Sequence, residues 1–142
     1  MLKNIDLSRY VVQHPIKIRP DANLFDAVDL IVTHRISGLC VVDADDRLIG
    51  VLSEMDCLRG VFSATYNDSG VGSVAEFMTT RNLHVAKLSD NIVDIATEML
   101  ARKIRRQPVI DDDGRLIGQI TIRQILRAVK AFAWSQERGA SA

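Results

Sequence analysis

The chain has 142 residues and no formal net charge at pH 7, because 18 Lys and Arg balance 18 Asp and Glu. Hydrophobic residues make up 47% of it and charged residues 25%, as in a globular domain that buries about two-thirds of its unfolded surface. These values exclude bulk electrostatic attraction to nucleic acid or to acidic membranes. No apolar run is long enough to cross a bilayer and the N-terminus lacks a signal-peptide core, so we expect a cytoplasmic protein.

The side chains that most often carry catalysis or bind metals are few and scattered. Cys40 and Cys57 lie in apolar surroundings without CxxC spacing, which predicts two reduced, packed thiols. His14, His34 and His84 show no metal-ligand spacing, and no Ser-His-Asp or Cys-His pattern is present. We therefore expect neither a metal site nor an enzyme.

Hydrophobic periodicity predicts the same order of elements twice along the chain. The first half predicts a helix over 6–12, a strand over 16–18, a helix from 24 to Gly38, strands over 39–42 and 47–52, and a helix over 54–62. Asn23 or Asp21 is the expected cap of the second of these helices. The second half predicts a helix over 74–78, a strand at 83–85, a helix over 92–100, strands over 108–110 and 115–121, and a helix from 122 to about 136. A polar loop over 65–72 separates the halves.

Many residues of the first half recur in the second half at a constant offset of 68, so that Asn23 corresponds to Asn91. The matching runs without gaps from Ala22 onward and includes Asp26 and Asp94, Ile36 and Ile104, Val41 and Val109, Asp43 and Asp111, and Arg59 and Arg127. This pattern favours an internal duplication, and its period is too long for a solenoid. We expect two half-domains, residues 1–72 and 73–142, that share one core.

One motif closes each repeat and identifies the pattern. Residues 50–56 read GVLSEMD, and residues 118–124 read GQITIRQ, each preceded by Arg-Leu-Ile. A repeat of strand, helix, two strands and helix that ends in Gly-apolar-apolar-Ser/Thr-x-x-Asp resembles the CBS domain, named after cystathionine β-synthase. Residues 36–43 (ISGLCVVD) resemble the second-strand signature of that family, with Cys40 where proline is usual, and residues 106–111 (RQPVID) keep the proline. Residues 8–131 therefore resemble a tandem CBS pair, or Bateman module.

The resemblance implies a fold and a class of function. It implies an α+β fold in which two pseudo-symmetric repeats pack sheet to sheet and leave two clefts that bind AMP, ADP or ATP, with NAD or S-adenosylmethionine as further possible ligands. It also implies a homodimer packed through helices, and a regulatory sensor of enzymes or transporters with no catalytic cofactor. Because the pair fills the chain, we expect the regulated partner to be a separate polypeptide.

The resemblance assigns ligand contacts to the motif of the first repeat. It implies that Asp56 accepts hydrogen bonds from ribose hydroxyls and that Ser53 contacts phosphate at the start of the following helix. A helix N-terminus presents free N–H groups and partial positive charge, which suits a phosphate. Gly50, followed by Val51, lets the backbone approach the ligand closely.

A second interpretation of the motif needs no ligand. Ser53-x-x-Asp56 is also a helix-capping pattern, and Thr121-x-x-Gln124 is a capping box in its own right. In the second repeat Gln124 stands where the family has aspartate, and a neutral amide cannot offer the same charged, two-pronged acceptor. We therefore expect one good site at Ser53 and Asp56, and a weak or empty site near Thr121.

The resemblance also implies an adenine pocket lined by two strands of the first repeat. Carried over residue by residue, the lining comprises Ile18, Arg19, Pro20, Ser37, Gly38, Leu39 and Cys40. Backbone groups there are expected to read the edge of the base while Leu39 and Val51 pack on its face. Packing of the same side chains in the core is the alternative.

Two further features concern partners. The basic cluster (residues 102–106, RKIRR) complements a helix dipole and offers candidates for phosphate contacts, as do Arg123 and Arg127. On the last helix we expect a core stripe of Ile122, Leu126, Val129 and Ala133, with Trp134 on another face where it would meet a second subunit or end a frayed helix. The alternatives to a nucleotide sensor are a ligand-independent interaction module and a nucleic-acid binder that uses the basic cluster; zero net charge and few aromatic residues count against the latter.

Overall fold

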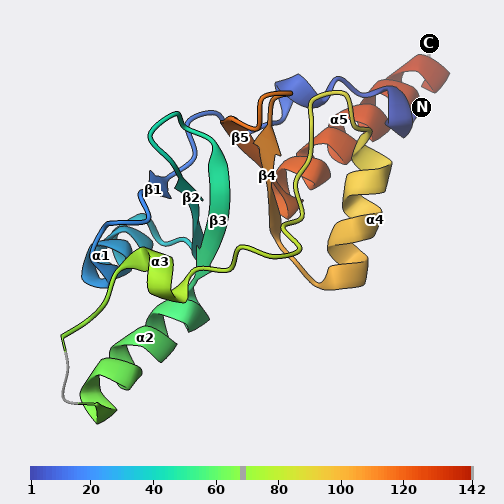
Figure 1. The fold of residues 1–142 in the computed structure, drawn as a ribbon. Helices are drawn as coiled ribbons and strands as arrows, with labels where there is room; N and C mark the ends of the chain where they lie inside the picture. The colour runs from blue at the N-terminus through green and yellow to red at the C-terminus, as the bar shows by residue number, and fades with distance from the viewer. Residues whose placement is uncertain (68–69, 142) are drawn as a thin grey trace. The chain divides into compact units, whose positions relative to one another are not determined.

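The computed structural model describes residues 1–67 and 70–141, with side chains described as far as Gln136. In chain order the elements are two 3-10 helices (Leu2–Asn4 and Leu7–Arg9), β1 (Lys17–Ile18), α1 (Leu24–His34), β2 (Gly38–Val42), β3 (Leu48–Ser53), α2 (Glu54–Tyr66), α3 (Val74–Phe77), α4 (Ile92–Arg102), β4 (Arg106–Ile110), β5 (Leu116–Thr121) and α5 (Ile122–Ser141) (Figure 1). No helix within these residues is long and apolar enough to cross a membrane.

The chain divides into two compact units. We call residues 16–83 with 114–116 the first-repeat unit, and residues 1–15, 84–113 and 117 onward the second-repeat unit. Each unit has its own hydrophobic core, in place of the single shared core expected from the sequence. Each contains most of its helices and strands in the predicted order. The mixed α and β fold with two repeats is therefore confirmed.

The first-repeat unit is built on a three-stranded sheet with the order β1-β2-β3. β1 runs parallel to β2 with Ile18 opposite Val41, and β2 runs antiparallel to β3 with Cys40 opposite Val51. Alternate strand residues project to opposite faces, and one face packs under α1, α2 and α3 (Figure 1). The side chains of that core come from every element of the unit: Ile18, Leu24, Ala27, Ile31, Leu39, Val41, Leu52, Cys57 and Val74.

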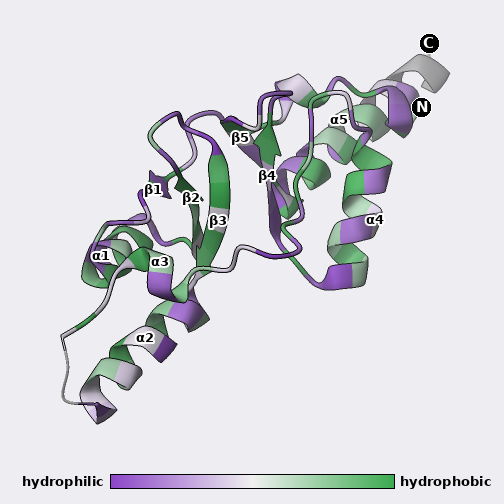
Figure 2. Cartoon of the chain, viewed as in Figure 1, coloured by the Kyte–Doolittle hydropathy of each residue, from purple (hydrophilic) through white to green (hydrophobic). Residues whose placement is uncertain are grey.

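The second-repeat unit has a two-stranded sheet, β4-β5, covered by α4 and α5. Figure 2 shows hydrophilic and hydrophobic residues alternating along α4, as expected for a helix with one buried face. The strand predicted at 83–85 is absent from the described elements; instead Ala86 forms an isolated parallel bridge with Val109. That segment is too short to extend a ladder beyond the single bridge, so the prediction of a strand was wrong.

The duplication is visible in the backbone at the ends of the matching helices. Asn23 and Asn91 cap α1 and α4 by accepting hydrogen bonds from backbone N–H groups of the first turn. The same helices end at Arg35 and Lys103, both left-handed with φ values of 54° and 56°. The predicted offset therefore extends to capping geometry, and Asn23 rather than Asp21 is the cap.

The segment that precedes each repeat packs in the unit of the other repeat. Val12 pairs with Gln119 of β5 through hydrogen bonds of 2.8 and 2.9 Å, within the second-repeat unit. Thr79 pairs with Val51 of β3 in the same manner, at 2.8 and 3.0 Å, within the first-repeat unit. The compact units therefore differ from the predicted halves, because each contains the segment that precedes the other repeat. The boundary at residue 72 stays a prediction about the sequence repeat.

Three other details differ from the sequence-based prediction. The expected helix over 6–12 is a short 3-10 helix, Leu7–Arg9, which begins after the Asp6 cap and ends at Tyr10. Helix α2 continues to Tyr66, so the expected polar loop begins later, and Asp68 and Ser69 of that loop lie outside the described residues. On α5 the fully buried side chains are Ile125 and Ala128, whereas Leu126 is 61% exposed. The core stripe of α5 is therefore displaced from the predicted one.

A buried polar side chain interrupts the core of the second-repeat unit. Gln107 on β4 is fully buried, and neither its amide nitrogen nor its oxygen has a hydrogen-bond partner. The equivalent residue of the first repeat is Leu39, which packs in the core. An unpaired buried amide costs about 1–3 kcal/mol relative to a satisfied one.

Gln107→Leu is expected to stabilise the protein by roughly 1–3 kcal/mol, because it removes the unpaired amide and restores the residue type found at Leu39. Urea denaturation followed by circular dichroism measures the change. Gln119→Leu on β5 is the control, since Gln119 is only half-buried and should change stability little. A loss of stability in Gln107→Leu would show instead that a bound water or ligand satisfies the amide.

Candidate functional site

The site predicted in the first repeat lies at the junction of β3 and α2. Ser53 is the N-cap of α2, and its hydroxyl accepts a hydrogen bond of 3.1 Å from the backbone N–H of Asp56. Asp56 reciprocates, because its Oδ2 accepts from the backbone N–H of Ser53 at 2.9 Å. This is a complete capping box, as the ligand-free interpretation of the motif requires.

The second oxygen of Asp56 also has a partner. Arg59, one turn along α2, donates to Oδ1 at 3.0 Å. Asp56 is 8% exposed whereas the Arg59 side chain is 65% exposed, so a buried carboxylate is paired with an exposed guanidinium. Each carboxylate oxygen can accept more than one hydrogen bond, so these contacts leave acceptor capacity for a hydroxyl. Arg59 was not among the site residues predicted from sequence, although its match with Arg127 in the repeat marked the position.

The start of β2 is joined directly to the motif. The carbonyl of Ser37 accepts from the backbone N–H of Glu54 at 3.0 Å, and Gly38 pairs with Ser53 in the β2–β3 ladder. A Cβ on Gly38 would come within 3.0 Å of the Leu52 carbonyl, so this position needs a small residue. Ser37 and Gly38 therefore lie beside Ser53 and the N-terminus of α2.

Gly50 and Val51 have packing partners of their own. A Cβ on Gly50 would come within 2.9 Å of the Thr79 carbonyl, and Val51 exchanges two backbone hydrogen bonds with the same residue. The close backbone approach that the glycine permits is therefore an approach to the segment at Met78 and Thr79. A ligand is not needed to explain Gly50.

The strand residues of the predicted adenine pocket do not all face the same way. Leu39 is opposite Leu52 and lies in the core under the helices, whereas Val51 is opposite Cys40 on the other face of the sheet. Side chains of Leu39 and Val51 thus project to opposite faces and are not brought together on one surface. For Leu39 the core-packing alternative describes its position.

The end of β1 supplies the remaining predicted residues. Ile18 is buried against the helices, Arg19 is exposed, and the carbonyl of Pro20 accepts from the backbone N–H of Ala75 at 2.9 Å. The Pro20 carbonyl is therefore already used to hold α3. Among these three residues, Arg19 has the side chain with the greatest access to solvent.

The pKa values of two side chains in the first-repeat unit are shifted, one by burial and the other by backbone hydrogen-bond donors. Burial raises the pKa of the Cys57 thiol, and the negative charges of Asp56 and Glu54 raise it further. Cys40 and Cys57 are both buried and neither forms a disulfide, as predicted. Beyond the β2 strand, the backbone N–H of Arg47 lowers the pKa of Asp43, with the N–H of Asp45 as a smaller cause. The Asp43 side chain therefore orders the acidic turn between β2 and β3.

The second repeat reproduces part of this arrangement without the carboxylate. Thr121 accepts from the backbone N–H of Gln124 at 3.2 Å, and Arg127 donates to the Gln124 side-chain oxygen at 3.1 Å. The geometry of Ser53, Asp56 and Arg59 is thus repeated with a neutral amide in place of the charged acceptor. Electrostatic attraction for hydroxyl donors is weaker at such a site.

The basic cluster of residues 102–106 is dispersed by the fold. Arg102 lies 3.9 Å from Glu98, Lys103 occupies the left-handed C-cap of α4, and the carbonyl of Arg105 accepts from Ile122 at the start of α5. Glu98 also contacts His84 at 2.8 Å. Over residues 1–67 and 70–141, no group of three or more His, Cys, Asp or Glu side chains is arranged to hold a metal ion.

Known proteins with similar sequences share the repeat. Inosine-5'-monophosphate dehydrogenase of Aquifex aeolicus is 34% identical over 121 residues, which cover 84% of this chain and 24% of that protein. The chain spans about a quarter of the length of the first curated relatives it matches. The similarity is therefore to one region of those enzymes.

Solved structures of similar fold are CBS-pair proteins. CBSX2 of Arabidopsis thaliana in complex with AMP has a TM-score of 0.81 and 29% identity, covering 92% of this chain and 99% of that one. The CBS domain pair of protein MJ0100, solved with 5'-methylthioadenosine and S-adenosyl-L-methionine, has a TM-score of 0.72 and 24% identity, covering 89% and 97%. This second likeness shows the fold alone.

The family model of the CBS domain matches the chain twice, over residues 6–63 and 72–131. These two matches cover both copies of the motif, at residues 50–56 and 118–124, together with the strands that precede them. The chain belongs to the CBS domain family, with two CBS domains in tandem.

Proposed function

We propose that this chain is a regulatory module that binds an adenine nucleotide in its first repeat and signals to a separate partner protein. The binding residues are centred on Ser53 and Asp56, with Ser37 and Gly38 beside them. The observation that carries the proposal is the corner where β3 ends, α2 begins and the start of β2 is hydrogen-bonded to the helix N-terminus. AMP, ADP and ATP are the ligands proposed, and the module itself catalyses no reaction.

The chemistry of the corner suits such a ligand. Helix α2 is 13 residues long, so the partial positive charge of its N-terminus attracts a phosphate, although the N–H groups of Glu54 and Asp56 already have acceptors in Ser37 and Ser53. The Asp56 carboxylate lies in that first turn and can accept from the vicinal hydroxyls of a ribose. One group attracts the anionic end of a nucleotide, and the other binds its sugar.

One of the similar structures supports an adenosine-containing ligand. CBSX2 was solved with AMP; the MJ0100 pair, whose likeness shows the fold alone, was solved with two other adenosine derivatives. The group common to these ligands is adenosine, and the substituent at its 5' position is the variable part. For this reason S-adenosylmethionine and NAD belong in any binding panel beside AMP, ADP and ATP.

Binding must rearrange the contacts that already surround Asp56. The exposed Arg59 guanidinium is bonded to the carboxylate that a ribose would approach. A phosphate that accepts from Arg59 would compensate for weakening this ion pair. We therefore propose that Arg59 moves from the carboxylate to the phosphate when the nucleotide binds.

The alternative is a ligand-independent interaction module. It is favoured by one observation, namely that the capping box and the Arg59 contact already give Ser53 and both Asp56 oxygens a partner. Thermal shift with increasing AMP, ATP, NAD and S-adenosylmethionine distinguishes the two functions. Only a protein that binds the added molecule gains stability with its concentration.

Asp56→Asn is expected to weaken AMP binding about tenfold or more, because it removes the charged acceptor for the ribose hydroxyls. The asparagine oxygen can still accept from the Ser53 N–H, so the cap is largely kept. Isothermal titration calorimetry measures the dissociation constant. Gln124→Ala, at the equivalent position of the second repeat, is the matched control and should leave AMP affinity nearly unchanged. Equal effects of the two substitutions would refute the assignment of the site to the first repeat.

Ser53→Ala is expected to lower the free energy of unfolding by about 1 kcal/mol, because the N-cap hydroxyl of α2 is lost. Ser53→Thr keeps an oxygen at the cap and should lose much less. Chemical denaturation without ligand measures this structural part alone. If Ser53→Ala leaves stability unchanged, the capping hydrogen bond of 3.1 Å contributes nothing in solution.

A further inference from the structure

The corner where β5 ends and α5 begins is much more basic than its counterpart in the first repeat. Each corner comprises five positions related by the offset of 68: Ser37, Glu54, Met55, Asp56 and Arg59 in the first corner, and Arg105, Ile122, Arg123, Gln124 and Arg127 in the second corner. Two carboxylates and one guanidinium give the first corner a net charge of −1. Three guanidinium groups and no carboxylate give the second corner a net charge of +3. The second copy has therefore exchanged acidic groups for cations.

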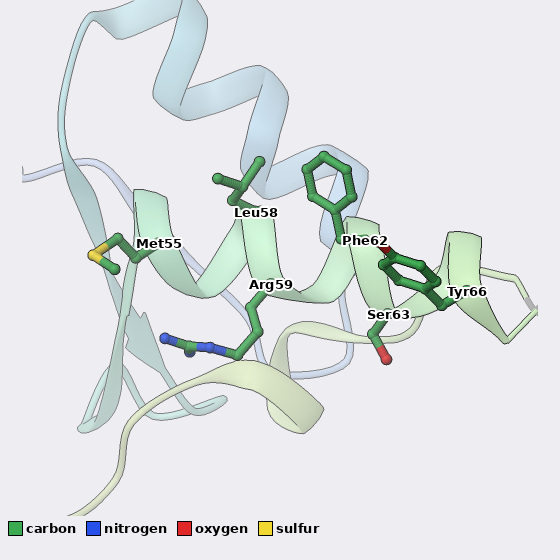
Figure 3. Close-up of a pocket in the computed structure, with 6 residues that line it drawn as sticks. All are labelled: Met55, Leu58, Arg59, Phe62, Ser63 and Tyr66. Carbon is green, nitrogen blue, oxygen red and sulfur yellow. The ribbon is translucent and has the colours of Figure 1, made fainter.

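The three cations of the second corner belong to two segments that a hydrogen bond joins. The carbonyl of Arg105 accepts from the backbone N–H of the first residue of α5 at 3.1 Å, which places the residue before β4 beside the first turn of the helix. Arg123 and Arg127 are four residues apart, so they share one face of α5. Figure 3 shows their counterparts Met55 and Arg59 along one shallow groove of α2, with the Arg59 guanidinium extending toward the start of that helix. All three arginines therefore start from the N-terminal turns of α5 or from the segment bonded to them.

The charge of these arginines is not neutralised within the part of the chain that the structure describes. Arg105, Arg123 and Arg127 are exposed, and none of them forms a salt bridge with a described side chain. Arg127 instead donates to the neutral Gln124 amide at 3.1 Å, whereas Arg59 of the first corner is paired with a carboxylate. Three cations near one helix N-terminus attract an anion that carries several charges.

A buried hydrogen-bond donor lies beneath the same turn. Gln107 on β4 is fully buried, and neither polar atom of its amide has a partner among the described residues. Its counterpart Leu39 packs in one core with Cys57 of α2, and the counterpart of Cys57 on α5 is Ile125, which is also a core residue. The offset therefore places the Gln107 amide under the start of α5. Its unused N–H donor suits an anionic oxygen, which is also the partner that the charge of the second corner favours.

The second corner lacks the group that would recognise a ribose. Gln124 offers a neutral amide oxygen, which already accepts from Arg127. The N–H groups of the first and third residues of α5 are bonded to the Arg105 carbonyl and the Thr121 hydroxyl. A ligand would therefore meet the side-chain cations rather than a carboxylate or those two backbone donors.

From these observations we infer that the second corner is a separate binding site for a phosphate chain, held by Arg105, Arg123 and Arg127 with the Gln107 amide beneath them. A guanidinium binds phosphate oxygens through two parallel hydrogen bonds, so three such groups favour several linked phosphates over one. Inorganic pyrophosphate, tripolyphosphate and the tail of a nucleoside triphosphate share this chemistry. The inference goes beyond the nucleotide proposed for the first repeat and does not depend on it.

Titration with sodium tripolyphosphate tests the site. Isothermal titration calorimetry of the full chain at fixed ionic strength should show one tripolyphosphate bound per chain, with pyrophosphate weaker and orthophosphate weakest. Arg105→Gln, Arg123→Gln and Arg127→Gln each remove one exposed cation and should weaken tripolyphosphate binding about tenfold. Lys130→Gln removes an exposed cation one turn beyond Arg127 and is the matched control, which should change the affinity less than about twofold.

Two results of this titration overturn the inference. Equal weakening by Lys130→Gln and by the three arginine variants would show that tripolyphosphate responds to the overall charge of α5 rather than to a site. A wild-type chain that binds no tripolyphosphate would exclude the site directly.

Competition distinguishes a phosphate chain from a nucleotide or a nucleic acid as the ligand. ATP should displace tripolyphosphate with an affinity no greater than that of tripolyphosphate itself, and AMP should not displace it, because adenosine adds no contact at the second corner. Displacement by AMP would show nucleoside recognition and overturn the inference. Tighter binding of a short RNA that the same three arginine variants abolish would assign the second corner to nucleic acid and overturn it too. If AMP binds nowhere on the chain, the proposed nucleotide function fails while the tripolyphosphate result stands.

Gln107→Leu tests the buried donor separately from the charge. The substitution keeps all three arginines, so any loss of affinity comes from the missing amide. Tripolyphosphate should bind this variant about threefold more weakly or worse, and circular dichroism checks that the variant is folded. An unchanged affinity in the folded variant would refute the role of Gln107 in the site.

Discussion

The reciprocal hydrogen bonds between Ser53 and Asp56 are the constraint on which the first repeat depends. They fix the direction in which α2 leaves β3, and the bond from Glu54 to the Ser37 carbonyl ties the start of β2 to the same point. These hydrogen bonds hold the carboxylate in one orientation before a ligand binds. Binding would therefore cost little side-chain entropy. Structural capping and the proposed nucleotide binding would therefore use the same arrangement, in which Arg59 is paired with Asp56.

The repeat made much of the fold predictable from the sequence. Helix α1, its Asn23 cap and the β2–β3 hairpin follow from periodicity and turn residues, and the offset of 68 extends the same inference to α4, β4 and β5. The prediction failed where an element depends on distant partners. The segment at 83–85 is apolar enough for a strand, but only Ala86 meets a neighbour, at Val109. Local pattern cannot show whether a partner strand lies within hydrogen-bonding reach.

The candidate site was predictable in its residue types but not in its orientations. Ser53 and Asp56 follow from the motif, whereas the opposite directions of Leu39 and Val51 depend on a strand register that the sequence does not show. On α5 two neighbouring apolar stripes compete for the core, one with Ile125 and one with Leu126, and periodicity alone does not choose between them.

The exchange of leading segments constrains the order in which the chain can acquire structure during its synthesis. The first-repeat unit includes Thr79, which pairs with β3, and residues 114–116, so it cannot be completed when its own repeat leaves the ribosome. The second-repeat unit conversely needs Val12, which is made first and must wait for Gln119. A cut at the midpoint would separate each sheet from a segment that pairs with it. Neither half is therefore expected to behave as an autonomous folding unit.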